Sequence, residues 1–465
     1  MEKSKQVDAV VIGAGITGLT TAFLLLKKGL SVLLLEKSAS VGGQMESIYE
    51  DGFIFESGPN TGVVSNAEVV ELFQLLGDRC SIEIARKEAK VRLIWKNGKF
   101  HPLPCGLSSS IATPLFTWND KIRILFEPFR KKGNDPFESV GSLARRRLGK
   151  SFVDYAVDPF ISGIYAGDPN KLVTRFALPK LYNLEQNYGS FIRGAMKKAS
   201  EPKSERDKLA TKEVFSVKGG FGSLAKALAD EIGSENIRLS VSDIQTKPVT
   251  DGWNVFLPDT NEQISSRYLV STVAAYSLPS LFNFIPEEEI APVSSLHYAP
   301  VIQVGVGVEQ ANGCVPNAFG GLVPSCEKQK MLGILFPSSC FANRSPEGGG
   351  TLSFFIGGSK HPEYLTYTDE QLQTLVKESL NKMMGFPADY SPSKIKIFRH
   401  EKAIPQYEAD SEQRLACIEK LQKKYPGLIL AGGIRDGIGM ADRIKQATKI
   451  AEVIKNESVF FENII

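Results

Sequence analysis

The chain has 465 residues, more than the ~250–300 at which a single hydrophobic core stops growing, so two or more domains are expected. Hydrophobic residues make up 42% of the chain and charged residues 23%, which excludes collagen-like, mucin-like and wholly disordered proteins. The net charge of +3 is too small to predict a nucleic-acid-binding surface, and no nucleic-acid partner is expected. The six cysteines include no C-x-x-C pair, so we expect neither a metal site nor a disulfide framework, and we predict a reducing, cytoplasmic location.

Residues 9–26 carry no charge and approach the length of a bilayer span, so a signal peptide or membrane segment must be considered. Three glycines and three threonines interrupt this stretch, and Lys27 and Lys28 follow it. A secretory signal instead begins with a basic region and ends at a small-residue cleavage site. The pattern therefore favours a folded segment over a signal or a span.

The first forty residues predict a strand, a helix and a second strand. Residues 7–12 form a short valine-rich run bounded by glycine, as in a buried parallel strand. Residues 17–28 have apolar positions at helical spacing, Gly29 fits the end of that helix, and residues 31–35 form a second buried strand. This order is a βαβ unit, so an α/β domain opens the chain.

From about residue 105 the pattern becomes helical. Helices are predicted over 122–129, 139–148 and 152–157, and the second contains the basic run Arg145-Arg146-Arg147. We interpret this run as a solvated helix face. Residues 200–213, with eight charges and a proline, predict an exposed linker.

The α/β pattern then returns. A helix ending near Ile232 precedes short strands near 237–244, 253–257 and 267–272. Four apolar or alternating runs separated by turn residues predict a mostly antiparallel sheet, at 301–308, 319–323, 331–336 and 351–356. Residues 428–431 form a last buried strand, followed by a glycine turn and a helix.

The predicted fold is therefore α/β, with a Rossmann-type domain built from discontinuous segments. An α+β substrate domain adds a mostly antiparallel sheet and a helical lobe. We assign residues 1–90, 214–280 and 403–465 to the dinucleotide domain, 91–213 to the helical lobe and 281–402 to the substrate sheet.

A G-x-G-x-x-G motif, Gly13-Ala14-Gly15-Ile16-Thr17-Gly18, lies between the first strand and its helix. The first glycine forms the tight turn, the second lets the backbone approach a pyrophosphate, and the third permits close helix–strand packing. The amino end of the helix faces the negative charge. Glu36, at the end of the second strand, is placed to accept hydrogen bonds from ribose hydroxyls. A dinucleotide site is therefore predicted.

The residues after Glu36 favour FAD over NAD. Glu36-Lys37 leads into Val41-Gly42-Gly43-Gln44, a second glycine pair just past the ribose carboxylate. This doublet resembles that of the FAD-containing amine oxidase and porphyrinogen oxidase superfamily. Glycines here would let the backbone pass close beneath the diphosphate and ribityl chain of the flavin.

Further segments narrow the resemblance to the oxygen-dependent, flavin-containing protoporphyrinogen oxidase family. Phe55-Glu56-Ser57-Gly58-Pro59 is similar to its F-E-x-G-P segment, and residues 158–169 to its PF-x-x-G-x-x-A-G-D-P block. The other similar segments are 320–325, 332–336, 355–359, 403–407 and 437–440. The match runs in order from about residue 7 to 455.

The resemblance implies an enzyme of haem biosynthesis that oxidises protoporphyrinogen IX to protoporphyrin IX. Flavin N5 would take hydride from a bridging methylene, and dioxygen would reoxidise the flavin to give hydrogen peroxide. The cofactor carries out this chemistry, so the protein needs only to position the substrate, remove water from around it and tune the flavin. No flavinylation motif is recognisable at any Cys or His, so the FAD is expected to be non-covalent.

The resemblance also implies the residues that hold the cofactor. They are Gly13, Ala14, Gly15, Ile16, Thr17, Gly18, Glu36, Lys37, Gly42, Gly43, Gln44, Gly58, Pro59, Asn60, Thr61, Val241, Gly437, Ile438, Gly439 and Met440.

A large, flat, mostly apolar macrocycle needs an apolar slot with a cationic anchor for its propionates. By resemblance, Leu322, Leu335 and Phe355 would enclose the ring, and Arg92 would pair with a propionate. Gly163 would lie at the reactive edge of the flavin, where a side chain would block the methylene, so Gly163 and Arg92 are the expected catalytic residues. By residue type alone, the three apolar residues would be ordinary sheet core.

Several alternatives stay open at this level. Coproporphyrinogen III is the main alternative substrate, and an amine or polyamine oxidase or a non-catalytic tetrapyrrole-binding flavoprotein are the alternative functions. Expected partners are the porphyrinogen and dioxygen, with the next haem-pathway enzyme and a second copy of the chain as further candidates. The helical lobe resembles a region that can contact a membrane, which would place the protein on the inner face of the cell membrane.

Overall fold

The first of the two large sheets in the fold has seven strands. The structure is a computed structural model, and it describes residues 3–462. The strands of this seven-stranded sheet lie in the order β10 (Ile237–Arg238), β2 (Val32–Leu35), β1 (Lys3–Ile12), β13 (Glu262–Ser271), β12 (Gly252–Leu257) and β11 (Gln245–Val249), and β19 (Leu428–Leu430) pairs with β13. The β10, β2, β1, β13 and β19 pairings are parallel, whereas β11 and β12 form an antiparallel meander.

The parallel strands end together at one edge of this sheet. Ile12 is opposite Leu35 on one side and Ser271 on the other, and Ser271 is opposite Leu430. Loops that follow parallel strands therefore meet at this edge, which we call the carboxyl edge, and in open α/β sheets ligands bind there.

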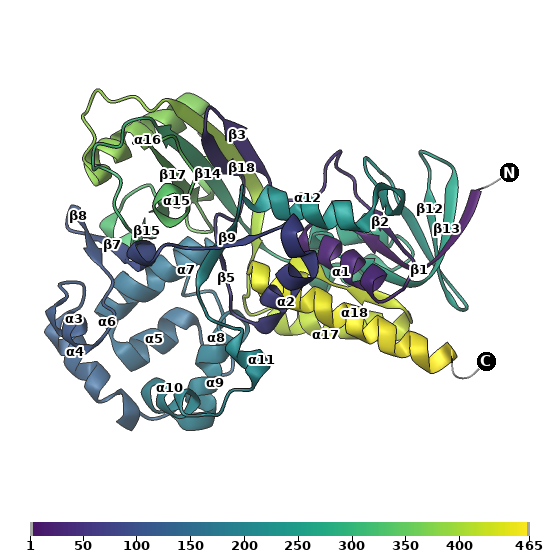
Figure 1. The fold of residues 1–465 in the computed structure, drawn as a ribbon. Helices are drawn as coiled ribbons and strands as arrows, with labels where there is room; N and C mark the ends of the chain where they lie inside the picture. The colour runs from purple at the N-terminus through teal and green to yellow at the C-terminus, as the bar shows by residue number, and fades with distance from the viewer. Residues whose placement is uncertain (1–2, 463–465) are drawn as a thin grey trace.

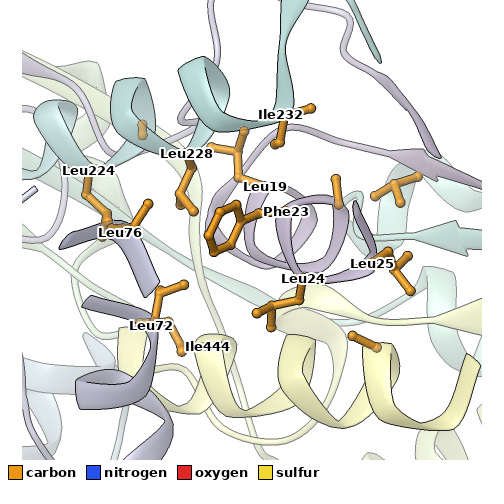
Figure 2. Close-up of a cluster of buried hydrophobic side chains, with 14 of the residues drawn as sticks. Leu19, Phe23, Leu24, Leu25, Leu72, Leu76, Leu224, Leu228, Ile232 and Ile444 are labelled. Carbon is orange, nitrogen blue, oxygen red and sulfur yellow. The ribbon is translucent and has the colours of Figure 1, made fainter. Parts of the chain in front are cut away.

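Helices cover both faces of the sheet. One face is covered by α1 (Ile16–Lys27), α2 (Ala67–Leu76), α12 (Phe221–Ile232) and α18 (Met440–Glu462), and the other by α13 (Leu278–Leu281), α14 (Glu287–Ser294) and α17 (Ser411–Lys424). Figure 2 shows Phe23 of α1 enclosed by Leu228 and neighbouring side chains from α2, α12 and α18. Each such side chain contributes about 1.5–3 kcal/mol on burial. The uncharged stretch at 9–26 is thus strand and buried helix, as predicted.

The second seven-stranded sheet lies beside the first (Figure 1). Its strands lie in the order β18 (Lys394–Pro405), β14 (Tyr298–Val308), β17 (Gly350–Gly357), β16 (Gly333–Leu335), β15 (Gly320–Leu322), β7 (Arg92–Lys96) and β8 (Lys99–Pro102). Only the pairing of β7 with β15 is parallel, so the predicted mostly antiparallel sheet is confirmed. One face of this sheet packs on α16 (Asp369–Met384). The strands predicted at 301–308, 319–323, 331–336 and 351–356 all belong to this sheet.

The helical lobe lies below the second sheet in Figure 1. Its elements are α3 (Leu107–Ala112), α4 (Trp118–Leu125), η3 (Glu127–Phe129), α5 (Val140–Leu148), α6 (Lys150–Phe152), η4 (Val153–Val157), α7 (Asp158–Tyr165), α8 (Thr174–Ala177), α9 (Pro179–Tyr188), α10 (Phe191–Ala199) and α11 (Glu205–Lys208). The division of the chain at residues 90, 213, 280 and 402 stays a prediction, and β7 and β8 join the substrate sheet although they fall within the range assigned to the lobe.

The interpretation of Arg145–Arg147 as a solvated face is wrong for most of the run. Arg147 is fully buried, and its guanidinium donates hydrogen bonds to Glu127 at 2.7 Å and to Glu185 at 2.5 Å. Arg146 pairs with Glu138 and Glu185, which leaves Arg145 as the exposed member. Arg147 can be buried because its carboxylate partners, Glu127 and Glu185, are buried with it.

Two small sheets connect these parts. β3 (Ser47–Glu50) pairs with β4 (Phe53–Glu56), and β9 (Val214–Val217) pairs with both β5 (Gly62–Val63) and β6 (Ile82–Ile84). Within residues 3–462, every helix is too short or too polar to cross a bilayer.

Candidate cofactor and substrate site

The loop from Gly13 to Gly18 lies at the carboxyl edge, between β1 and α1. A Cβ on Gly18 would stand 1.8 Å from the carbonyl oxygen of Gly13, so helix and loop touch too closely for any side chain. A Cβ on Gly15 would meet nothing within 4 Å, so this part of the loop faces open space. The motif therefore combines tight packing at its ends with an accessible backbone at its centre, as a pyrophosphate requires. Ala14, Ile16 and Thr17 complete it.

Glu36 follows β2 at the same edge and is 8% exposed. Its carboxylate accepts hydrogen bonds from Ala14 N at 2.6 Å and from Ser38 N at 2.9 Å. The amide of Val241 donates to the carbonyl of Glu36 at 2.9 Å. The predicted ribose carboxylate is therefore held between the first loop and the segment after β10, with Lys37 exposed beside it.

The second glycine pair packs directly on the first loop. Gly42 N donates to the carbonyl of Ala14 at 2.8 Å, and a Cβ on Gly43 would be 3.4 Å from Gly15 Cα. A Cβ on Gly58 would be 2.3 Å from the carbonyl oxygen of Gln44. Three predicted cofactor segments that lie apart in the sequence are thus in contact.

Residues 58–61 connect the two large sheets. Ser353 Oγ of β17 donates to the buried Asn60 Oδ1 at 2.7 Å. Gln303 Nε2 of β14 donates to the carbonyl of Glu56 at 2.7 Å. The segment that includes Gly58, Pro59, Asn60 and Thr61 therefore passes from the nucleotide loops to the face of the second sheet that is turned away from α16.

The turn at Gly437, Ile438 and Gly439 precedes α18, which begins at Met440. Gly437 N donates to the buried Tyr407 hydroxyl at 2.8 Å, and Gly439 N donates to Asp442 Oδ2 at 3.2 Å. Burial raises the pKa of the Tyr407 phenol, so it stays neutral. Sequence reasoning did not assign a role to Tyr407 or Asp442; the P-Q-Y segment was the only available signal.

These observations test whether a flavin dinucleotide fits the edge. The open backbone at Gly15, the buried carboxylate of Glu36 and the amino ends of α1 and α18 together suit a diphosphate and a ribose. The groups match the donors and acceptors that FAD presents. A separate groove of about 720 Å³, around Asp8, Trp253 and Arg267, is lined by none of the predicted cofactor residues.

The three predicted ring-contacting residues share one face of the second sheet. Leu322, Leu335 and Phe355 lie on the adjacent strands β15, β16 and β17, and Gly333 pairs with both Leu322 and Phe355. Each is half-buried, whereas the residues before and after it in the chain are buried. Phe354, for example, is fully buried in the core against α16. Because side chains alternate along a strand, the three residues turn away from that core.

Helix α7 covers this face. A Cβ on Gly163 would be 2.4 Å from Leu322 Cδ2, so the bare backbone of the helix touches the leucine. Phe160 and Ile164 are 41% and 44% exposed beside Gly163. Their i, i+3 and i, i+4 spacing places them on one helix face. The sequence did not assign Phe160 and Ile164 to the candidate site, although both lie in the segment 158–169 that carries the family resemblance.

Arg92 lies on β7 opposite Gly320, which in turn is opposite Leu335. The arginine is exposed, its guanidinium is 5.4 Å from the ring centre of Phe319, and it forms no ion pair with any residue in 3–462. The structure thus brings Arg92, Gly163, Leu322, Leu335 and Phe355 to one side of one sheet. We call this sheet face, together with the side of α7 that covers it, the slot.

The fold and the cofactor edge define a class, the FAD-dependent oxidoreductases. The model of the family "Flavin containing amine oxidoreductase" matches residues 16–454, and the chain belongs to that family. Its cofactor is FAD.

Two curated relatives indicate where in the family the chain lies. Over 96% of this chain and 94% of the relative, it is 30% identical to the mitochondrial protoporphyrinogen oxidase of Nicotiana tabacum. It is 26% identical to the coproporphyrinogen III oxidase of Bacillus subtilis (strain 168), over 94% of this chain and 95% of that one.

Solved structures agree on the fold. A crystal structure from Exiguobacterium sp. 255-15 has a TM-score of 0.80 at 23% identity, covering 98% of this chain and all of the other. Cyclohexylamine oxidase from Brevibacterium oxydans IH-35A has a TM-score of 0.70 at 16% identity, with 97% and 99% covered. These comparisons confirm the predicted fold class.

Proposed function

We propose that the chain oxidises protoporphyrinogen IX to protoporphyrin IX in haem biosynthesis, with dioxygen as the electron acceptor. The observation that carries this proposal is the slot, in which the half-buried Leu322, Leu335 and Phe355 share one sheet face and Leu322 contacts the bare backbone of α7 at Gly163. An apolar sheet face opposite a helix suits a flat macrocycle better than it suits a compact amine. The named relatives support the same substrate class.

Bound FAD supplies the two-electron oxidation. In each step the substrate loses a hydride and a proton, and one dioxygen takes up two electrons and two protons to give hydrogen peroxide. The chain's own contribution is to hold the ring. Leu322, Leu335 and Phe355 would exclude water from its faces, and the absence of a side chain at Gly163 leaves Leu322 undisplaced on the slot face. Arg92, which forms no ion pair with any residue in 3–462, would offer its guanidinium to a propionate.

Coproporphyrinogen III is the alternative substrate, supported by the Bacillus subtilis relative. It carries propionates where protoporphyrinogen carries vinyl groups, so it would need more cations around the slot. Amine oxidases share the fold, but the putrescine oxidase and cyclohexylamine oxidase structures similar to this chain are 13–16% identical and support the fold alone.

The test is anaerobic reduction of the bound flavin by each porphyrinogen, followed by aerobic turnover. We expect bleaching of the flavin absorbance and higher kcat/KM with protoporphyrinogen. A higher kcat/KM with coproporphyrinogen would show that coproporphyrinogen III is the substrate instead. A flavin that neither porphyrinogen reduces would contradict the proposal and indicate a carrier.

We further propose that the lobe contacts an anionic membrane surface, and that a second copy and the next pathway enzyme are additional partners. Support for the membrane contact comes from large apolar side chains on α4 and η3: Trp118, Leu125 and Phe129 are 65%, 68% and 77% exposed. Cations accompany them, since Lys121 lies over the Trp118 ring and Arg193 over the Phe129 ring. An apolar surface bordered by cations suits the interface of an anionic bilayer.

Co-sedimentation with phosphatidylglycerol-containing vesicles tests this contact. The wild type should pellet with the vesicles, and a Trp118→Ser/Phe129→Ser variant should not. Val453→Ser, which alters an exposed apolar residue on α18, is the matched control and should pellet like the wild type. A wild type that stays in the supernatant would contradict the contact.

A further inference from the structure

A compact polar cluster ties α7 to the second sheet at the end of the slot. Asp158, the first residue of α7, is buried. Its carboxylate accepts hydrogen bonds from Ser325 N at 2.7 Å and Ser325 Oγ at 3.1 Å, and it forms an ion pair with Lys360. Lys360 Nζ also donates to Ser325 Oγ at 3.0 Å, so the three side chains bond one another. We call this cluster the latch.

The latch joins the helix to the two strands that carry slot residues. Ser325 follows β15, which ends at Leu322, and Lys360 follows β17, which contains Phe355. Helix α7 continues from Asp158 to Gly163, whose backbone touches Leu322. Over so short a length a helix is stiff, so a shift of its first residue moves Gly163 as well.

Apolar packing holds α7 on its lobe side, where Ile161 is fully buried and Val157 packs beside it. The side of α7 that faces the second sheet is held by the latch. A cavity of about 240 Å³ lies beside it, lined by Ser325 and Lys360 of the latch together with Ser162, Leu332 and Gly358. Atoms at a cavity lack partners on one side and lose the corresponding contacts. Beside this cavity, the charge-assisted hydrogen bonds of Asp158 are therefore the polar restraint that ties α7 to the second sheet.

We infer that Asp158 is a positioning residue, which acts through Ser325 and Lys360 to set the separation of α7 from the sheet and so the width of the slot. This inference rests on the proposed function of the slot. Loss of the latch would let the Gly163 end of α7 move away from Leu322, and the ring would no longer be held in one orientation. A displacement near 1 Å can reduce a rate about a hundredfold.

The experiment uses the FAD-bound full chain and compares Asp158→Asn and Lys360→Gln with Glu289→Gln. Glu289 forms an ion pair with Lys424 at 2.7 Å between α14 and α17, away from the slot, and serves as the matched control. Both latch variants should lower kcat/KM for protoporphyrinogen by roughly tenfold, as expected for one charge-assisted hydrogen bond. FAD content and reoxidation of reduced flavin by dioxygen should stay unchanged. Asp158→Glu, which keeps the charge, should recover part of the loss.

Amide hydrogen exchange over residues 158–166 gives a readout that does not depend on the substrate. Both latch variants should exchange faster there by roughly tenfold, and Glu289→Gln should not. Faster exchange in the latch variants, together with a wild type that oxidises neither porphyrinogen, would support the latch and reject the proposed function. Unchanged exchange and unchanged kcat/KM in both latch variants would overturn the latch and leave the proposed function standing.

Discussion

Gly163 of α7 and Leu322 of β15 touch so closely that a Cβ on the glycine would lie 2.4 Å from Leu322 Cδ2. The residues come from a helix in the lobe and a strand in the second sheet, so this contact fixes how near the two parts approach. Leucine can move its terminal methyl group by changing rotamer. The contact therefore couples a glycine to the space that a ligand would occupy.

Gly163→Ala should lower kcat/KM for porphyrinogen by about tenfold or more, because the displaced Leu322 narrows the slot. The double variant Gly163→Ala/Leu322→Ala should be less impaired than the product of the two single effects predicts, since the shorter side chain removes the clash. Steady-state kinetics of the four proteins measures this coupling. Strictly multiplicative effects would show that the two residues do not share a role.

Phe355→Ala and Phe354→Ala form a matched pair on adjacent positions of β17. Phe355 is half-buried on the slot face, so its loss should reduce kcat/KM by roughly tenfold while FAD content and stability change little. Phe354 is fully buried against α16, and its loss should destabilise the fold by about 3–5 kcal/mol. Urea unfolding and turnover, measured on both variants, separate the two roles. Loss of flavin in proportion to activity in Phe355→Ala would place that residue in the core.

Arg92→Ala should raise KM for porphyrinogen strongly and leave bound FAD intact, because the guanidinium has no ion-pair partner in residues 3–462. Arg92→Lys should recover part of the loss, since lysine supplies charge without the planar fork. The exposed Lys99→Ala on β8 is the control cation. A porphyrinogen with esterified propionates should be a poor substrate for the wild type, and Arg92→Ala should add little to that defect. Equal impairment on acid and ester would assign Arg92 a structural role.

Glu36→Gln should weaken FAD binding by roughly tenfold or more, the loss expected for a charge-assisted contact worth ~1.5–3 kcal/mol. The carboxylate also accepts from Ala14 N and Ser38 N, and an amide can satisfy only part of this set. Titration of the apoprotein with FAD measures the affinity, with the exposed Glu452→Gln as control. Unchanged affinity, or bound NAD in the wild type, would contradict the cofactor assignment of this residue.

The buried carboxyl group of Glu56 should make the free energy of unfolding depend on pH. Burial raises the pKa of its carboxyl from 4.5 to about 7, although Ser47 Oγ and Phe221 N donate to it. The native state therefore binds more protons than the unfolded state between these values, so stability falls as the pH rises through this window. The contribution amounts to up to about 3 kcal/mol. Glu56→Gln mimics the protonated acid and should lose less stability than the wild type between pH 5 and 8.

Urea unfolding at several pH values, with the exposed Glu46→Gln as control, measures this difference. Parallel stability curves for the wild type and Glu56→Gln would show that the carboxyl titrates normally in the native state.

Local patterns in the sequence were sufficient for the elements that depend on near neighbours. The βαβ unit at residues 7–35 was predictable because hydrophobic periodicity, glycine positions and chain order all agree there. The strands that carry Leu322, Leu335 and Phe355 were predictable as strands. Their arrangement on one face turned away from α16 depends on strand order, which only the structure gives.

Features that depend on distant partners were not predictable. The burial of Arg147 requires Glu127 and Glu185, which lie on other elements of the lobe. The parallel pairing of β7 with β15 likewise joins residues far apart in the chain. Phe160 and Ile164 have no sequence signal that separates a slot-facing side chain from a core one. The assignments of individual cofactor and substrate residues stay predictions that the variants above can test.

The carboxyl edge brings together loops that are made at very different times during synthesis. Asn66 donates a hydrogen bond to the carbonyl of Ala441, 375 residues later, and β19 and the turn before α18 complete the edge that the loop after β1 begins. Contacts of such high sequence separation form late, because the chain between them must be ordered first. A ribosome-bound chain that stops before β19 would thus carry the whole glycine motif and still lack the predicted cofactor turn at Gly437–Met440. Flavin loading should accordingly follow translation, and the supply of FAD at that moment would determine how much of the newly made protein completes its fold.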